Sequence, residues 1–282
     1  MSQSKLNQIS PHVYWLPPDS TTDRPVLGVV AGERSTLLVD AGNSPAHARL
    51  FLAEVARLPV ALPQFLVLTH WHWDHIFGAA TIGLPTLAHQ ETRRRLVEMA
   101  GWDWSDAALD KRVAAGVEIE FCRDMIKAEL PDRSDLILRP PDIAFTRQVE
   151  LDLGGISAQL IHVGGDHAPD SIIVFIPEER VVFMSDCLAP DLYHPPRRYT
   201  PRRLFPLMDQ LLRCEADFYL MGHNPEPVSR AELETYTSRL RLIGQLVERL
   251  GPNRAAILAE LGRFDQDDEE DLDCFLAGLE GK

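Results

Sequence analysis

Three histidines and one aspartate lie within six consecutive positions of this chain, at His70, His72, Asp74 and His75. They directly follow the apolar run of residues 65–68. Imidazole and carboxylate groups are costly to bury side by side unless a cation pairs with them. Zinc and other borderline metals, which take nitrogen and oxygen ligands, provide such a cation. The segment therefore predicts a metal site.

The spacing of these residues predicts room for two metal ions. Where a chain is extended, residues i and i+2 point the same way, so His70 and His72 can bind one ion. A turn into a helix would then direct Asp74 and His75 toward a second position close by. A lone histidine beside a strand is usually a packing or surface residue, but that interpretation does not suit three histidines at this density.

The segment resembles the HxHxDH signature of the metallo-β-lactamase superfamily. Four further segments, each after an apolar run, match the pattern of that family in the same order: Asp40-Ala41-Gly42, Gly164-Gly165-Asp166-His167, Ser185-Asp186 and Gly222-His223. The resemblance covers about residues 10–225. It implies an α/β fold, the four-layer αββα sandwich of this family.

The resemblance also implies how the ligands divide. By that pattern one metal is held by His70, His72 and His167, and a second by Asp74, His75 and His223, with Asp186 bridging the two. A carboxylate suits the bridging position because it has two oxygens to offer. Asp40 is expected to support a metal-bound histidine from behind. Asp74 is expected to orient an attacking hydroxide or to move a proton.

His162 is the rival of His167 as the third ligand of the first metal. His162 falls inside a β-type run, where the sheet would hold its side chain, whereas His167 follows the flexible pair Gly164-Gly165. We therefore expect His167 at the metal. The family commonly has glycine at the position of Asp166. This carboxylate either orients His167, alters the preference for one ion, or faces solvent.

The elements that must position these residues appear as apolar runs bounded by Pro, Gly, Asp or Asn. Strands are expected at residues 13–16, 26–31, 36–39, 149–153, 157–163, 171–176, 181–184 and 218–221. Helices are expected from Ser44-Pro45 to about residue 58 and from Thr200-Pro201 to about residue 214, since proline favours the first helical position.

We expect two units: a metallo-β-lactamase-like domain of residues 1–228, and a helical extension of residues 229–282 packed on it. Within the first, about residues 89–140 have helical patterning and form an insertion. Such insertions often shape pockets, although this one could equally be a plain structural cover. Apolar faces on the insertion and on the C-terminal helices would allow a homodimer.

Composition limits the partners and the location. The chain has 282 residues and a formal net charge of -14, which disfavours nucleic acid because phosphates attract basic surfaces. No stretch approaches the roughly 20 apolar residues of a membrane span, and the first residues lack the apolar core of a secretion signal. Four widely spaced cysteines without a CxxC pair indicate free thiols. We expect a cytoplasmic protein that acts on a small molecule and binds neither nucleic acid nor a membrane.

The loop of residues 193–199 follows the predicted bridging Asp186 and should lie near the mouth of a pocket. Arg197 could steer an anionic substrate into the site, or simply pair with the acidic surface. Tyr193 could donate a hydrogen bond to a substrate oxygen. Trp73, within the metal motif, either packs its loop or lines the pocket mouth.

These observations predict a metal-dependent hydrolase. Two divalent ions, with zinc favoured and manganese or iron left open, would share a hydroxide that attacks an ester, thioester, lactone or amide carbonyl. The alternative is a persulfide dioxygenase-like oxidoreductase with a single iron, because such proteins look similar and keep most of these ligands. A non-catalytic binding module is disfavoured, because no ligand of the pattern is missing.

Overall fold

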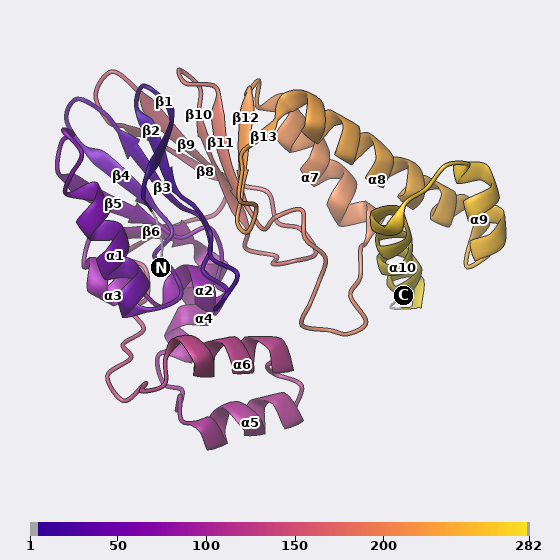
Figure 1. Cartoon of the computed structure of the whole chain (residues 1–282), viewed down its shortest axis with the longest axis horizontal. Coiled ribbons are helices and arrows are strands. Elements are labelled where there is room, and N and C mark those ends of the chain that lie inside the picture. The colour runs from indigo at the N-terminus through magenta and orange to yellow at the C-terminus, as the bar shows by residue number, and fades with distance from the viewer. Residues whose placement is uncertain (1–4, 281–282) are drawn as a thin grey trace.

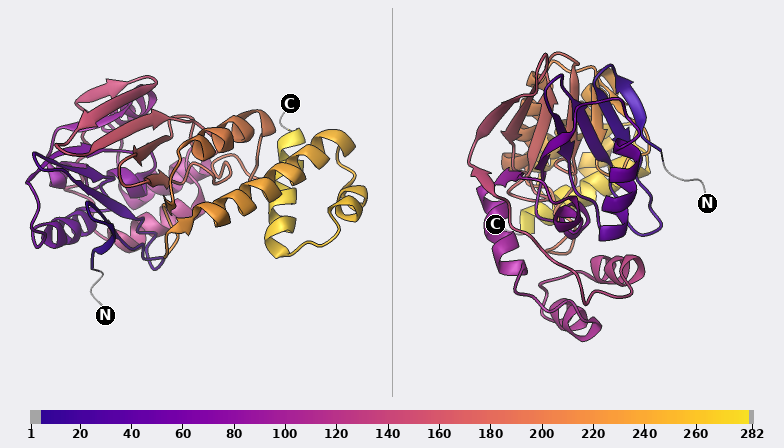
Figure 2. Two further views of the ribbon diagram at one scale, coloured as in Figure 1. Left: turned by 90° about the horizontal axis from the view of Figure 1, so that it is seen from above. Right: turned by 90° about the vertical axis from the view of Figure 1, so that its left-hand side faces the viewer.

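The computed structural model describes residues 5–280. Within that range the strands form a seven-stranded and a six-stranded sheet that face each other, and helices cover the outer face of each sheet (Figure 1, Figure 2). This arrangement is the four-layer αββα sandwich of the α/β class, so the predicted fold is confirmed.

The first sheet follows chain order and changes from antiparallel to parallel halfway. Its strands are β1 (Asn7–Ser10), β2 (Val13–Leu16), β3 (Leu27–Ala31), β4 (Thr36–Val39), β5 (Pro63–Val67), β6 (Thr86–His89) and β7 (Ile143–Phe145). Strands β1 to β4 pair antiparallel, and β4 to β7 pair parallel. The carboxyl ends of the parallel strands therefore meet at one edge, where loops can converge on a site.

The second sheet has the order β13-β12-β11-β10-β9-β8. Its strands are β8 (Gln148–Asp152), β9 (Ser157–His162), β10 (Ile172–Ile176), β11 (Val181–Ser185), β12 (Phe218–Met221) and β13 (Val228–Ser229). Strands β11 and β12 are parallel neighbours, and the helix between them makes the crossover. Both strands thus end on the same side, next to the loop that follows β5.

Two groups of helices form the outer layers. On the first sheet lie α1 (Pro45–Val55), α2 (Trp73–Ile76), α3 (Ala79–Ile82) and α4 (Gln90–Met99), whereas α5 (Asp106–Ala114) and α6 (Glu120–Glu129) project beyond the sheet (Figure 1). On the second lie α7 (Pro201–Arg213) and α8 (Arg230–Leu250), followed by α9 (Arg254–Leu261) and α10 (Gln266–Glu280). The end of α8 with α9 and α10 extends away from the sheets as an arm (Figure 1, Figure 2).

Three apolar layers hold the sandwich together. Val30 and Leu160 are buried between the two sheets, Phe51 between the first sheet and its helices, and Tyr219 between the second sheet and its helices, in the same apolar cluster as Phe275 of α10. Complete burial of a side chain of this size contributes about 1.5–3 kcal/mol to stability. Residues of α8 and α10 share the third layer with β12, so the C-terminal helices and the second sheet have one core. The division at residue 228 stays a prediction.

The helices begin where the sequence offers caps. Ser44 accepts a hydrogen bond from His47 N at 2.9 Å at the start of α1, and Ser229 with Glu232 forms a capping box at the start of α8. Such caps satisfy backbone N–H groups that the first turn leaves unpaired. The start of α1 agrees with the expected helix after Ser44.

The helical insertion is tied to the body of the protein by one buried carboxylate. Glu129, the last residue of α6, accepts hydrogen bonds from Arg24 Nη2 at 2.8 Å and from Ser44 Oγ at 2.5 Å. These contacts join α6 to the loop before β3 and to the start of α1. The helices end there, and residues 130–142 contain neither helix nor strand. Residue 89, where the insertion was expected to begin, is the last of β6.

Two further observations concern the environment of the protein. The four cysteines are free and buried, as expected for thiols without disulfide partners. Across residues 5–280, no helix combines the length and apolar character that crossing a bilayer would require.

The turn between β3 and β4 packs directly on the turn between β8 and β9. Glu33 N donates to Gly154 O at 2.8 Å, and Arg34 N donates to Leu153 O at 2.9 Å. A β-carbon on Gly32 would lie 2.2 Å from Leu153 O, well inside van der Waals contact. Gly32 therefore permits the two sheets to meet at this end.

We expect Gly32→Ala to lower the free energy of unfolding by about 1–3 kcal/mol, because the added methyl group must push a backbone carbonyl aside. Gly101→Ala is the control, since its β-carbon would come no closer than 3.7 Å to a neighbouring atom. Chemical denaturation measures both variants. Equal stabilities would show that the two turns do not touch in solution.

Asp271 in α10 provides a test of how closely the C-terminal helices pack. Burial, together with the charges of Asp268 and Asp267, raises the pKa of its carboxyl to about 7. The folded protein then binds a proton that the unfolded chain releases near its ordinary pKa, so stability falls as pH rises from about 4 to about 7. Asp271→Asn should remove this loss. In thermal melts across that pH range, the stability of the variant relative to the wild type should increase as pH rises. The same dependence of stability on pH in both proteins would contradict the packing.

Candidate metal centre

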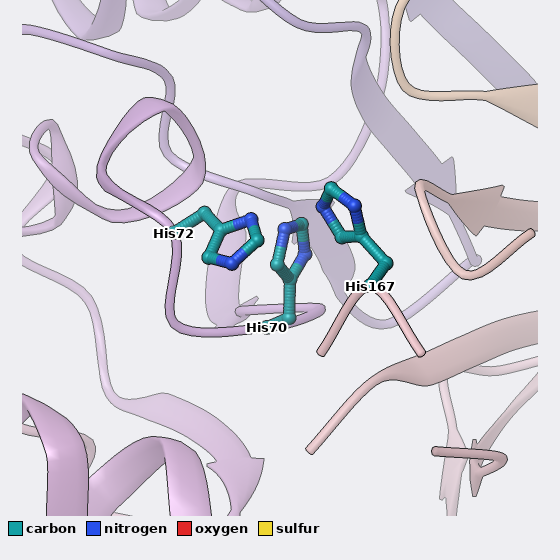
Figure 3. A group of neighbouring side chains, drawn as sticks. All are labelled: His70, His72 and His167. Carbon is teal, nitrogen blue, oxygen red and sulfur yellow. The ribbon is translucent and has the colours of Figure 1, made fainter. Parts of the chain in front are cut away.

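Three buried histidines, His70, His72 and His167, gather with their rings side by side (Figure 3). One ring nitrogen of each lies within 4.8 Å of the others. His70 and His72 stand in the loop after β5, and His167 stands in the loop after β9, where Gly164 and Gly165 adopt positive φ. Because glycine adopts such angles at little cost, the pair permits the turn that returns this loop to the centre.

The Nε2 atoms of these histidines are buried without a hydrogen-bond partner among the described residues. Burial, reinforced by the neighbouring histidines, lowers the pKa of His70 and of His72, and burial also lowers the pKa of His167. The rings are therefore neutral, with lone pairs free to coordinate. Unpaired buried nitrogens are costly, and one divalent cation would satisfy all three. The donor set fits such an ion.

A second group of donors lies beside the first and consists of Asp74, His75, Asp186 and His223. Asp74 and His75 belong to α2, whereas Asp186 follows β11 and His223 follows β12. His75 Nε2 lies 2.9 Å from Asp74 Oδ2 and 2.8 Å from Asp186 Oδ2. His223 Nε2 lies 3.2 Å from Asp74 Oδ2, and its side chain is 38% exposed. This second group also fits a divalent metal.

Asp186 lies between the two groups. Its Oδ2 is 3.7 Å from Nε2 of His70 and 3.7 Å from Nε2 of His167. The same oxygen is 2.8 Å from Nε2 of His75 and 3.6 Å from Nε2 of His223. A carboxylate in this position is able to offer oxygens to two neighbouring ions.

Charges within the second group balance one another. Burial would raise the pKa of Asp186, but the charges of His223 and His75 outweigh burial and hold that pKa well below its usual range. Burial would lower the pKa of His223, but Asp186 and Asp74 outweigh it and raise the pKa to about 11. Metal binding requires neutral imidazole, so a divalent ion would replace these protons.

Asp40 holds this centre from behind. Its Oδ1 accepts a hydrogen bond from Thr69 N at 2.7 Å, and its Oδ2 accepts one from Thr69 Oγ1 at 2.8 Å and lies 2.8 Å from His75 Nδ1. It thus links the end of β4 to the loop that carries the histidines. The expected contact between Asp40 and a clustered histidine is present, and its effect on metal binding stays a prediction.

Unusual backbone angles occur where strands enter the centre. Asp40 has φ 61°, and Ser185, directly before Asp186, has φ 50°. Positive φ costs non-glycine residues free energy of order 1–3 kcal/mol and often marks functional sites. On the neighbouring strand, a β-carbon on Gly222 would lie 2.0 Å from Asp186 Oδ1. Glycine at 222 therefore leaves room for the carboxylate beside His223.

The two residues that compete with or precede His167 have other contacts. The ring of His162 stacks on His89 with centroids 3.9 Å apart, and its Nε2 lies 2.8 Å from Pro169 O. His162 therefore takes no part in the cluster, as expected. The carboxylate of Asp166 accepts a hydrogen bond from Thr200 N at 2.7 Å. Two of the roles left open for Asp166 involve the metal site, and the structure supports neither, because the carboxylate of this residue anchors the start of α7.

A pocket of about 360 Å³ opens over the two groups. Its floor includes His72, Asp74, His167, Asp186 and His223. Its walls come from α6, from residues 188–193, from Tyr199 and from Tyr236 of α8. The insertion and the C-terminal helices thus both contribute to the pocket.

Of the three predicted substrate contacts, only Tyr193 lines this pocket. Of the two alternatives for Trp73, pocket lining is wrong and packing is confirmed, because its side chain is 2% exposed and packs edge-on against Phe77 with ring centroids 5.7 Å apart. As the first residue of α2, Trp73 points into the core under the first sheet. Arg197 is exposed and is not among the pocket-lining residues, so its position does not support contact with substrate.

Asp23 is a pocket residue that the sequence analysis missed. It stands in the loop before β3 with φ 60°, and its Oδ1 lies 3.4 Å from His223 Nδ1. Burial, together with the charge of Asp74, raises the pKa of this carboxyl to about 7. Phe121 and Tyr236 were missed as well. All three lie outside the family motifs, and no local pattern marks them.

Comparison with known proteins agrees with this geometry. Residues 23–248 match the model of the metallo-beta-lactamase superfamily. A linear primary-alkylsulfatase from Pseudomonas sp. (strain ATCC 19151) is 24% identical over 172 residues, which are 56% of this chain and 32% of that relative. The chain therefore spans about a third of the length of this curated relative.

Solved structures share the fold. The stereoselective inverting sec-alkylsulfatase Pisa1 from Pseudomonas sp. matches with a TM-score of 0.66 and 16% identity, covering 95% of this chain and 46% of that one. A metallo-beta-lactamase family protein from Thermus thermophilus matches with a TM-score of 0.59 and 20% identity, covering 97% of this chain and 94% of that one. Identities this low show the fold alone.

We expect Asp40→Asn to lower zinc affinity about 10- to 100-fold, because the partner that orients His75 loses its charge. Competition with a chromophoric chelator measures the affinity. Asp152→Asn, which alters an exposed carboxylate paired with Arg34, is the control and should bind zinc as the wild type does. If both variants bind zinc equally well, Asp40 does not support the metal.

Proposed function

The chain belongs to the metallo-beta-lactamase superfamily, and from that premise we propose that it is a dinuclear metal-dependent hydrolase. Its substrate would be a small molecule with an ester, thioester, lactone or amide carbonyl. One observation carries this proposal: two complete donor groups meet at Asp186 on the floor of a pocket.

We assign the ligands by their grouping. His70, His72 and His167 would hold one ion, and Asp74, His75 and His223 a second, with Asp186 shared. Nitrogen and carboxylate donors without cysteine suit zinc, and they also accept manganese or iron. Two divalent ions in these positions would lower the pKa of a water molecule toward neutrality and polarise the carbonyl under attack.

Asp74 is the residue best placed to move a proton. It lines the pocket, and its Oδ2 is within 3.2 Å of both His75 and His223. As a ligand of a divalent ion, this carboxyl would be ionised. The ionised carboxylate would accept the proton of the attacking water and pass it to the leaving group. The pocket walls would exclude bulk water from this exchange.

The rival functions explain less of the site. A persulfide dioxygenase-like centre with a single iron would leave Asp74, His75 and His223 converging without a metal. A binding module that only kept the fold would not need the donors, yet none of the expected residues is displaced. The matched alkylsulfatases support a hydrolase in general terms, and because the chain spans so little of their length we do not carry over their substrate.

The remaining expectations on partners and location stay proposals. An acidic chain with a buried site suits a small-molecule substrate better than nucleic acid. Four free cysteines suit a reducing compartment such as the cytoplasm.

We expect zinc-reconstituted protein to contain about two ions per chain and to hydrolyse a panel of p-nitrophenyl esters, thioesters and lactones, with loss of activity on chelation. His167→Ala should retain about one ion, because it removes a ligand of the first group only. His162→Ala is the matched control and should keep both ions, since that ring contacts His89 and Pro169. Elemental analysis and initial rates measure these outcomes. A single iron per chain with oxygen consumption on a persulfide would contradict the proposal.

A further inference from the structure

The walls of the pocket over the metal centre are apolar above the ligand floor. Six of the side chains that line the walls are aliphatic or aromatic: Phe121, Leu188, Leu192, Tyr193, Tyr199 and Tyr236. They come from three separate parts of the chain, namely α6, the segment after Asp186, and α8. At about 360 Å³ the pocket is within the range of small-molecule sites.

The three tyrosines turn their hydroxyl groups toward the protein. Tyr199 Oη donates to Leu188 O at 3.0 Å, and Tyr193 Oη contacts Cys122 Sγ at 3.7 Å. The hydroxyl of Tyr236 lies beside that of Tyr199. With their polar ends already engaged, the tyrosines offer the carbon faces of their rings to a ligand.

No lysine or arginine of the described chain lines this pocket. Two arginines of neighbouring segments are engaged elsewhere. The Arg95 guanidinium lies 4.5 Å over the Trp71 ring, and Arg24 pairs with Glu129 at 2.8 Å. Asp23 instead adds a carboxylate beyond those of the two donor groups. A charged group on the chain of a substrate, away from the metal ligands on the floor, would find no side-chain cation in these walls to pair with, and burying an unpaired charge is costly.

We propose that this pocket selects substrates whose chain is uncharged and apolar, such as a linear acyl or alkyl group. The ring of Phe121, at the mouth of the pocket, would pack against this chain. This inference rests on the proposed hydrolase function for the position of the reacting bond. Phe121 belongs to the first turn of α6 and is 51% exposed while it also lines the pocket. A ligand chain would cover that exposed ring, and each methylene it buries strengthens binding about three- to fourfold.

The direct test measures binding to the zinc-loaded protein by isothermal titration calorimetry. The probes are 1-butanol, 1-hexanol and 1-octanol. We expect the Kd of these alcohols to fall about threefold or more per added methylene.

Variants locate the binding surface. Phe121→Ala should weaken 1-octanol about fivefold, and Phe121→Leu should weaken it less, because leucine restores part of the apolar contact. Phe264→Ala is the matched control: that ring is 43% exposed and is not among the pocket-lining residues. It should leave binding unchanged. No dependence of the alcohol affinities on chain length, or equal effects of the two alanine variants, would overturn the inference.

Rates on p-nitrophenyl acetate and p-nitrophenyl octanoate separate this inference from the proposed function. Hydrolysis of both esters with kcat/KM independent of chain length would overturn the inference while the hydrolase stands. Binding of the alcohols as expected, with no hydrolysis of any ester, would support the apolar pocket and overturn the proposed function. Higher kcat/KM on the octanoate, reduced in Phe121→Ala, would support both.

Discussion

The crowding of four imidazoles around the buried Asp186 carboxylate is the constraint on which the rest of this structure depends. The Nε2 atoms of His70 and His167 lie 3.7 Å from that carboxylate without any hydrogen-bond partner among the described residues. Such an arrangement is costly without a cation. The positive φ of Asp40 and Ser185, and the glycine forced on position 222 by Asp186, add to that cost. Together, these features are consistent with a site that is formed to bind metal ions.

The sandwich solves the problem of bringing these groups together. The donors follow β5, β9, β11 and β12, which belong to two different sheets. Because the two sheets face each other across a shared apolar core, the ends of these strands meet at one edge, and short loops suffice to complete the centre. Backbone hydrogen bonds then fix the loops: Ile172 N donates to Thr69 O at 2.9 Å, and Gly222 N donates to Ser185 O at 3.0 Å. A rigid scaffold therefore sets the positions of the donors.

The sequence predicted the centre far better than the pocket, for a physical reason. The ligand types stand in short motifs at strand ends, so local pattern locates His70 and His167 without knowledge of the fold. Two strands that were missed had weak signals: β1 is polar and half exposed, and β7 has three residues. Trp73 and Arg197 do not line the pocket, because closeness in sequence to a ligand or to its loop does not determine the direction of a side chain. Helix geometry turned Trp73 into the core.

The centre and the pocket walls are consequently built from different parts of the chain. The family fold supplies the donors, while Phe121 comes from the helical insertion, Tyr236 from the C-terminal helices and Asp23 from the loop before β3. The pair Arg24 and Glu129 ties that loop to the insertion, so two of the walls are coupled. Relatives with the same fold and 15–24% identity are free to change such segments without disturbing the metal ligands. The family fold therefore accounts for the placement of the donors, whereas the substrate must be inferred from the residues of the pocket walls.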